Sequence, residues 1–140
     1  MSNNQPHVAF NSEELLIRQA VEGDVHALRE LFENSILEGQ TRENDTGADL
    51  EYLASSYFDC KESGFWVAQY EDGVVGMIGV QRINENSAEI RRLRVRDSYR
   101  RNGIGKKLML HAIEFCKQKQ FLHAKLIKVQ SSNHLIEFLG

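Results

Sequence analysis

The sequence predicts a mixed α/β (α+β) domain in which a single, mostly antiparallel sheet is flanked by helices. Three observations predict this class: helical spacing of apolar residues near the N-terminus, a long hairpin pattern in the middle, and a strand–helix–strand pattern near the end. The chain has 140 residues, which fits one domain. We expect residues 1–13 to be a flexible N-terminal segment and residues 14–140 to form the domain.

The first third of the chain predicts one strand followed by two helices. Leu15–Ala20 has the composition of a strand, and Asp24 can then cap a helix. The apolar residues of that helix recur at helical spacing: Val25, Leu28, Leu31, Phe32 and Ile36. After a polar loop, Asp49 can cap a second, shorter helix that carries Leu50, Leu53 and Tyr57.

The middle of the chain predicts a hairpin and then a strand with a bulge. Phe65–Ile83 contains two β-prone runs around Glu-Asp-Gly, where Asp-Gly suits the positive φ angles of a tight turn. In the strand that follows, Leu93 and Val95 share one face, but Ile90 lies an odd number of residues from both. If all three are buried, the register must slip between Ile90 and Leu93, which predicts a β-bulge.

The last third predicts a strand–helix–strand unit. From Gly103 the period becomes helical, with Ile104, Leu108, Ala112 and Phe115 on one face, and residues 124–129 return to a strand. Residues 88–130 have the size of one right-handed βαβ unit, so the two strands should be parallel. Residues 133–140 are predicted to begin a final helix.

Composition and charge exclude several classes of function. The formal net charge is −3, so the positive charge is local, and we expect no nucleic-acid partner. No apolar run is long enough to span a bilayer, so we expect no membrane partner either. Cys60 and Cys116 have neither CxxC nor zinc spacing, and the five histidines form no ligand pair, which predicts reduced thiols, a cytoplasmic protein and no metal site.

The junction before the last-third helix predicts an anion site. The first amides of a helix have no partner within it, and Gly103 and Gly105 would let an anion approach them. In an empty site Lys106 and Lys107 would each cost about 0.3–1 kcal/mol against the helix dipole, and a bound phosphate reverses that sign. The alternative for these two lysines is that they are solvated surface residues.

Two phosphate-binding motifs are excluded at this junction. Nothing matches the Walker A pattern GxxxxGK[ST]. In a dinucleotide fingerprint a third small residue would stand where this chain has Leu108. A nucleotide-dependent kinase or dehydrogenase is therefore not expected.

What remains is the pattern R-x-x-G-x-G over Arg100–Gly105, which resembles the pyrophosphate-binding motif of the GCN5-related N-acetyltransferases. The resemblance covers residues 15–139 and includes the first strand and helix, the hairpin and residues 88–109. It implies that acetyl-CoA is the co-substrate and that its pantetheine arm lies between the fourth and fifth strands. The implied contacts are Leu93, Arg94 and Val95 for the arm and Arg100, Arg101, Asn102, Gly103, Ile104, Gly105 and Lys106 for the pyrophosphate.

The resemblance also implies a reaction, the direct attack of a primary amine on the thioester in a ternary complex. Glu89 is the candidate general base and Glu85 a weaker alternative. The structural alternatives for Glu89 are an ion pair with a neighbouring arginine or a solvated position on the strand. A backbone amide near Leu93–Val95 is the implied oxyanion donor. The acceptor would be a small-molecule or peptide amine that meets the loop Glu38–Asp49, whose acids (Glu38, Glu43, Asp45, Asp49) fit a cationic acceptor or a solvated loop.

The sequence departs from the family pattern at its end. Counting from Asn133 to the position of the family's acidic tyrosine reaches Leu139 or Gly140, neither of which is an acid. The family's two last strands also have no counterpart, which would leave the fifth strand as an exposed edge in a shortened chain, or as an edge covered by a partner subunit in a homodimer. The alternatives to an enzyme are a non-catalytic acyl-CoA-binding or regulatory module and a structural domain without a ligand.

Overall fold

The computed structural model describes residues 9–37, 45–127 and 134–138. Within them, six strands form one sheet in the order β1-β2-β3-β4-β5-β6. The strands are β1 (Leu16–Gln19), β2 (Gly64–Tyr70), β3 (Gly73–Asn84), β4 (Ser87–Val95), β5 (His123–Leu126) and β6 (His134–Glu137). Neighbours are antiparallel except β4 and β5, which are parallel. The predicted mixed, mostly antiparallel sheet is confirmed.

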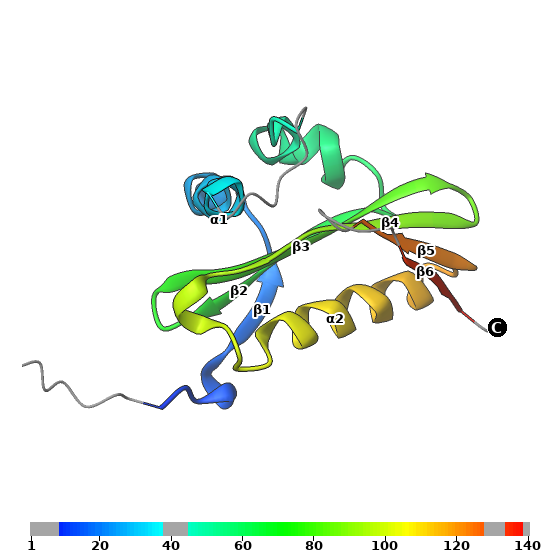
Figure 1. Ribbon diagram of the computed structural model, residues 1–140. Coiled ribbons are helices and arrows are strands. Elements are labelled where there is room, and N and C mark those ends of the chain that lie inside the picture. The colour runs from blue at the N-terminus through cyan, green and yellow to red at the C-terminus, as the bar shows by residue number, and fades with distance from the viewer. Residues whose placement is uncertain (1–8, 38–44, 128–133, 139–140) are drawn as a thin grey trace, which may run out of the picture.

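Helices cover both faces of the sheet (Figure 1). On one face lie α1 (Val25–Leu37) and the short turns η3 (Ala48–Glu51) and η4 (Ala54–Phe58), and on the other face lies α2 (Ile104–Gln118). Three further 3₁₀ turns are η1 (Ser12–Glu14), η2 (Glu22–Asp24) and η5 (Asp97–Tyr99). β4, α2 and β5 form the predicted βαβ unit. In it, α2 packs on one face of the sheet, against β3 and β4.

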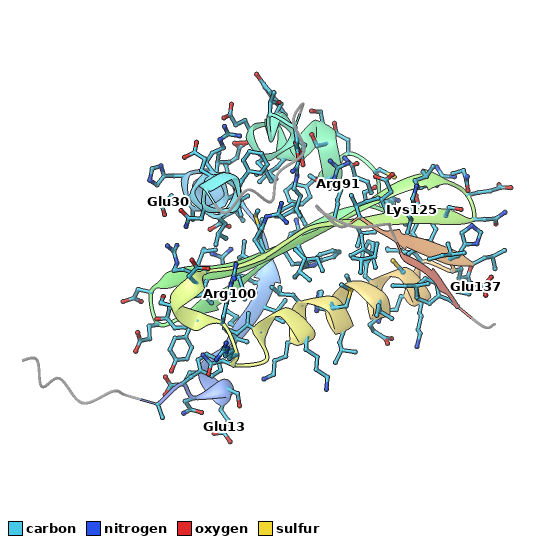
Figure 2. The ribbon with its side chains drawn as sticks, viewed as in Figure 1. Glu13, Glu30, Arg91, Arg100, Lys125 and Glu137 are labelled. Atoms are coloured by element: carbon cyan, nitrogen blue, oxygen red, sulfur yellow. The ribbon has the colours of Figure 1, made fainter. Side chains whose placement is uncertain are left out.

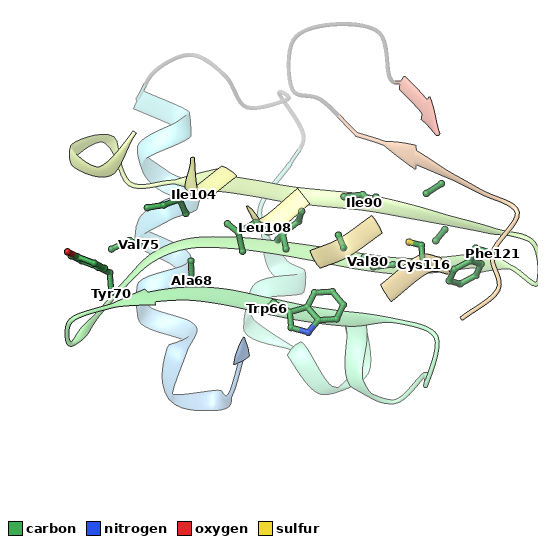
Figure 3. Packing of buried hydrophobic residues seen from close by; sticks show 14 residues of the cluster. Trp66, Ala68, Tyr70, Val75, Val80, Ile90, Ile104, Leu108, Cys116 and Phe121 are labelled. Carbon is green, nitrogen blue, oxygen red and sulfur yellow. The ribbon is translucent and has the colours of Figure 1, made fainter. Parts of the chain in front are cut away.

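The core has two layers, one on each face of the sheet. Between α2 and the sheet, Ile104, Leu108, Ala112 and Cys116 of the helix pack on side chains such as Trp66 (Figure 3). On the other face, the second cluster is formed by Ala20, Leu28, Leu31, Phe32, Leu50, Leu53, Tyr57, Phe65, Val67 and Met77. Leu28, Leu31 and Phe32 of α1 and Ile104, Leu108 and Ala112 of α2 are thus buried as predicted, Val25 and Phe115 are partly buried, and the burial of Ile36 lies outside the description.

The hairpin is formed by β2 and β3, but its turn lies one residue earlier than expected. Tyr70 pairs with Gly73, so the two loop residues are Glu71 and Asp72. The positive φ of 55° falls on Glu71, and Gly73 is already the first residue of β3. The expectation that Asp-Gly takes the positive φ angles was wrong, because the register of the two strands sets the position of the turn.

The bulge in β4 is confirmed, and it lies between Ile90 and Leu93. Met77 of β3 pairs with Arg94 and Gly79 with Arg91, so β4 contains one more residue than β3 over this interval. The extra residue is Arg92, whose φ is +63°. Ile90 and Leu93 consequently pack against the same cluster beneath α2.

The predicted final helix was wrong, because His134–Glu137 is the strand β6, antiparallel to β5. A run of only a few apolar residues cannot be distinguished as helix or strand by periodicity, and pairing with β5 decides in favour of the strand. The outer edge of β5 is thus covered within this chain, and the expected exposure of that edge was wrong too. A partner subunit is not needed to cover it.

The second helix is also different from the prediction. Residues 48–58 form a 3₁₀ turn, η3, and a short π-helix, η4, instead of one regular helix, and Leu50, Leu53 and Tyr57 are buried as predicted. Asp49 does not cap a helix; its carboxylate instead accepts hydrogen bonds from Tyr57 and Arg92.

The described part of the N-terminal segment contacts the domain. The ring of Phe10 lies 4.6 Å from that of Tyr70, and the backbone N–H of Asn11 donates a 2.9 Å hydrogen bond to the Tyr70 hydroxyl. Across the described residues, no helix has the length and apolar character that a membrane crossing requires.

Candidate active site

The central feature of the site is a separation of β4 from β5. Among the described residues, the two strands pair from Ser87 to Ile90, and the last hydrogen bond at this end runs from the Ile127 N–H to the Ile90 carbonyl at 2.9 Å. Residues 91–95 of β4 continue to pair with β3. On their other side no described strand pairs with them, so this edge can accept a strand-like ligand.

The direction of the backbone groups at this edge follows from the ladder. Arg96 donates its N–H to the Val75 carbonyl at 2.8 Å, and polar groups alternate sides along an antiparallel strand. The backbone groups of Arg94 therefore point to β3, whereas those of Leu93 and Val95 point to the open edge. The Leu93 carbonyl accepts a 2.9 Å hydrogen bond from the Arg94 guanidinium.

The turn between β4 and α2 forms a second feature, which we call the amide nest and define as the backbone N–H groups of residues 101–106. Arg101 and Gly103 both have left-handed φ angles, 69° and 78°, on either side of Asn102. Successive N–H groups converge in such alternating conformations and bind anions. Within the described chain, no group accepts a hydrogen bond from these N–H groups, and the first cap bond of α2 is that of Lys107 to the Gly103 carbonyl.

The two glycines of the nest have different roles. Gly103 needs its positive φ, and a Cβ on it would meet no atom within 4 Å, so the space in front of the amides is open. A Cβ on Gly105 would lie 3.7 Å from Val95, an ordinary contact with the end of β4. The nest is therefore directly beside the open edge.

The loop before the nest is fixed by side chains and carries positive charge. The Asn102 side-chain amide donates to the Tyr99 carbonyl at 3.1 Å, and Tyr99 packs edge-on to Tyr70. Arg100, at the loop in Figure 2, forms a 3.1 Å ion pair with Asp97. Arg101, Lys106 and Lys107 are exposed around the amides. A diphosphate group would meet both free amides and surplus cations here.

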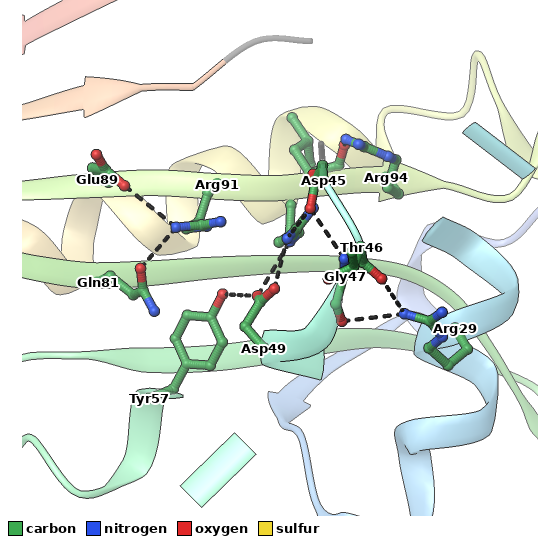
Figure 4. Close-up of polar contacts among 12 residues, drawn as sticks. Arg29, Asp45, Thr46, Gly47, Asp49, Tyr57, Gln81, Glu89, Arg91 and Arg94 are labelled. Carbon is green, nitrogen blue, oxygen red and sulfur yellow. Dashed lines mark hydrogen bonds and ion pairs between the residues drawn. The ribbon is translucent and has the colours of Figure 1, made fainter. Parts of the chain in front are cut away.

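Glu89 lies on the face of the sheet that α1, η3 and η4 cover. Its carboxylate is 3.4 Å from the Arg91 guanidinium, and the same arginine nitrogen donates to Gln81 at 2.8 Å (Figure 4). The ion pair that the sequence offered as the structural explanation is thus present. Glu89 directly precedes Ile90, where β4 and β5 separate, and 28% of its side chain is exposed. It can therefore reach a substrate that enters at the separation point.

Glu85 is in a different position. It is exposed in the turn between β3 and β4, four residues before Glu89 along the chain. Four strand residues span on the order of 13 Å, so Glu85 lies well away from the point of separation. Of the two carboxylates, only Glu89 is adjacent to the gap.

Sequence reasoning missed a cluster around Arg92, the bulge residue. Its guanidinium donates to Asp45 at 2.6 and 2.8 Å and to Asp49 at 2.6 and 3.2 Å. It also lies 5.1 Å from the centre of the Phe32 ring. Asp45 and Asp49 lie 47 and 43 residues from Arg92 along the chain, so no local sequence pattern predicts the contact. The predicted bulge was the one available signal, because it places an arginine on the face of the sheet that α1, η3 and η4 cover.

The charges in this cluster compensate one another. Hydrogen bonds from Arg92 hold the pKa of Asp45 below its ordinary value. Burial works to raise the pKa of Asp49, but hydrogen bonds from Arg92 and Tyr57 outweigh it and the pKa is lowered. Asp45 and Asp49 are therefore ion-pair partners of an internal arginine, which compensates their charge; Glu38 and Glu43 lie outside the described residues.

The remaining predictions on the site lie outside the described chain or concern groups that the structure does not bring together. Leu139 and Gly140, the positions reached from Asn133, are not among the described residues. In the described ranges, no group of three or more His, Cys, Asp or Glu side chains is arranged to hold a metal ion.

Together, fold and site define an α/β protein that can hold a diphosphate in the amide nest and an extended arm along the open edge of β4. The model of the acetyltransferase (GNAT) family matches residues 26–139, and this chain belongs to that family. The residues present fit coenzyme A, because the nest supplies free donors and the edge of β4 beyond Ile90 has no strand partner on that side among the described residues.

Known proteins resemble this chain in sequence and in structure. Human N-acetyltransferase 8 is 31% identical over 78 residues, which are 52% of this chain and 34% of that protein. A GNAT-family acetyltransferase of Staphylococcus aureus Mu50 superposes with a TM-score of 0.72 at 25% identity, over 80% of this chain and 71% of that chain. The fold is also shared with N-acetylglutamate synthase of Neisseria gonorrhoeae, crystallised with coenzyme A and N-acetyl-glutamate (TM-score 0.68, 19% identity, 89% of this chain and 26% of that chain). The chain thus spans about a third of its curated relative.

Proposed function

We propose that this chain is an N-acetyltransferase that transfers the acetyl group of acetyl-CoA to a primary amine of a small molecule or peptide. The observation that carries the proposal is the position of the amide nest beside the open edge of β4. The nest fits the diphosphate, and the edge at Leu93 and Val95 fits the amide-containing arm. The thioester would then lie near the point where β4 and β5 separate.

The chain's own groups can serve each part of the transfer. The Glu89 carboxylate accepts a proton from the acceptor ammonium, directly or through one water, and so frees the nitrogen lone pair. The nitrogen attacks the thioester carbonyl carbon, the backbone N–H at Leu93 or Val95 donates to the developing oxyanion, and the C–S bond breaks as the C–N bond is completed. Because a thiol has a pKa of about 8.5, the thiolate of coenzyme A can leave without protonation by an acid.

Direct attack in a ternary complex is favoured by the state of the cysteines. Cys116 lies in the core beneath α2, and burial raises the pKa of its thiol to about 12. Cys60 hydrogen-bonds to Glu62 in the turn before β2. Among the described residues, no histidine or lysine hydrogen-bonds to either thiol, so neither has the partner that usually activates a cysteine nucleophile. Both are free, which fits the cytoplasm as the compartment.

A binding measurement and a turnover measurement together test the proposal. Calorimetry with acetyl-CoA should give one-site binding, and a panel of amines should release free CoA thiol in the presence of the protein. Binding without turnover over the whole panel would favour the alternative, a non-catalytic acyl-CoA-binding module. Absence of binding would contradict both.

A further inference from the structure

Arg92 is an unusual residue to find at a bulge. Its side chain is 5% exposed, and its φ of +63° lies in the left-handed region. That conformation costs a residue with a Cβ roughly 1–2 kcal/mol, so something else must hold it. Burying a guanidinium is also unfavourable unless it is paired. Both costs fall on the residue that separates the two halves of β4.

The pairing comes from the loop between α1 and η4. Asp45 and Asp49 together accept four hydrogen bonds from the Arg92 guanidinium. Two acceptors in different directions fix both the position and the plane of the guanidinium. Because the side chain is held at its far end, its backbone cannot return to an extended φ without breaking these bonds.

The two aspartates are themselves held in place. Asp45 accepts a 3.1 Å hydrogen bond from the Gly47 N–H, and Asp49 accepts one of 2.6 Å from the Tyr57 hydroxyl. Arg29 of α1 donates to the carbonyls of Thr46 and Gly47 at 2.9 and 3.2 Å (Figure 4). Residues 45–49 are therefore fixed by hydrogen bonds to α1, to their own backbone and to Tyr57.

The bulge determines the open edge. Up to Ile90, β4 pairs with β5; the extra residue follows within two positions, and from there β3 is the strand's one partner among the described residues. A bulge bends its strand and increases the local twist. It also puts Leu93 on the α2 side and its backbone groups on the open edge. If Arg92 took an extended conformation, the register of residues 93–95 would change.

We propose that Arg92, clamped by Asp45 and Asp49, is a positioning residue that holds the β4 bulge and thereby the edge on which the arm of acetyl-CoA binds. The inference rests on the proposed function, because that function assigns the arm to the edge. The inference gives residues 45–49 a role in cofactor binding, although η3, which contains Asp49, lies on the opposite face of the sheet from α2 (Figure 1).

The test compares two ion pairs of similar geometry in the same chain. Arg92→Gly removes the clamp and also relieves the strain of the positive φ, and Asp45→Asn breaks the Asp45 side of the clamp while Asp49 still accepts hydrogen bonds from Arg92. Asp24→Asn is the matched control, since Asp24 accepts hydrogen bonds of 2.8 and 2.9 Å from Arg18, which belongs to β1 at the far edge of the sheet. For each variant, calorimetry gives the Kd for coenzyme A and thermal unfolding gives the stability.

The clamp variants should bind coenzyme A about tenfold or more weakly under conditions where they are folded, because the edge is no longer held in register. Asp24→Asn should lose stability but keep the wild-type Kd. If Arg92→Gly does not fold, Asp45→Asn still decides, since its side chain is 25% exposed and Asn keeps its shape.

Two results would overturn the inference and are distinct from failure of the proposed function. A wild-type Kd in the folded clamp variants would show that the bulge needs no clamp, and an equal loss in Asp24→Asn would show a general effect of stability. If the wild-type chain itself does not bind coenzyme A, the proposed function fails, and the inference fails with it.

Discussion

Arg18 of β1 donates two hydrogen bonds, of 2.8 and 2.9 Å, to the carboxylate of Asp24. Asp24 also accepts a 2.8 Å hydrogen bond from the backbone N–H of Val21. Asp24 is 7% exposed, and its position just before α1 joins the first strand to the first helix. The hydrogen bonds from Arg18 hold the pKa of Asp24 below its ordinary value. This pair therefore links stability to pH.

The free energy of unfolding should fall in acid, and Asp24→Asn should remove the part of this pH dependence that comes from Asp24. Because the folded-state pKa of Asp24 is depressed, the unfolded chain takes up the proton first; the contribution is present above the unfolded pKa of about 3.9 and is lost as pH falls through the folded pKa. At pH 7 the substitution should cost about 1–3 kcal/mol of unfolding free energy in urea. An unchanged difference between wild type and variant from pH 6 down to acid would contradict this linkage.

Gly47→Ala should destabilise the fold. Gly47 has a φ of +70°, and a Cβ there would lie 2.7 Å from the Arg29 guanidinium and 2.9 Å from the Phe32 ring. We expect a loss of about 1–2 kcal/mol or more in chemical unfolding. Gly23→Ala is the control, because a Cβ there meets nothing within 4 Å and its φ is not positive. Equal effects of the two substitutions would show that the loop does not need this conformation.

Lys106→Glu should have opposite effects on stability and on binding. In the free protein, replacing a cation by an anion in the first turn of α2 should stabilise the helix by about 0.3–1 kcal/mol. The same carboxylate should weaken coenzyme A binding by repelling the diphosphate. Lys117, in the last turn of α2, is the control, since Lys117→Glu should lower stability and leave binding unchanged. Stability and affinity that change in the same direction for Lys106→Glu would argue against an anion at the nest.

Glu89→Gln should lower kcat and leave the affinity for coenzyme A unchanged. The amide keeps the shape and a contact with Arg91 but cannot accept a proton, and the loss of a general base typically costs about 10²–10⁴-fold. Steady-state kinetics with a productive amine, together with calorimetry, separate the two effects. Glu85→Gln should behave like the wild type, and a variant at position 89 with unchanged kcat would remove Glu89 from the mechanism.

Periodicity and turn chemistry predicted the parts of the fold that depend on near neighbours. The hairpin, the βαβ unit and the burial of Leu108 and Ala112 follow from the alternation of apolar residues over short ranges. Even the bulge was predictable, because three apolar residues of odd spacing cannot share a face without an extra residue. The motif at Gly103 likewise predicted a helix that begins at free amides.

What the sequence did not predict depends on partners far along the chain. Asp49 resembles a helix cap locally, yet it pairs with Arg92, 43 residues away. The segment 134–137 is a strand because β5 offers it an edge, which its own composition does not reveal. The sequence allowed Glu89 to be a general base or an ion-pair partner of an arginine. The ion pair with Arg91 is present, and it does not by itself exclude the role as a base.

The central claim is that the backbone amides of residues 101–106 hold the diphosphate of coenzyme A. Its most direct test is a calorimetric titration with coenzyme A of three folded proteins: wild type, Gly103→Glu, and Gly73→Glu as the control. A Cβ on either glycine meets nothing within 4 Å, so both side chains have room, but only position 103 belongs to the amide nest; Gly103→Glu also carries the strain of a φ of +78°, which is why only folded protein is compared. We predict one-site binding for the wild type and for Gly73→Glu and no detectable binding for Gly103→Glu; wild-type affinity in Gly103→Glu would contradict the claim.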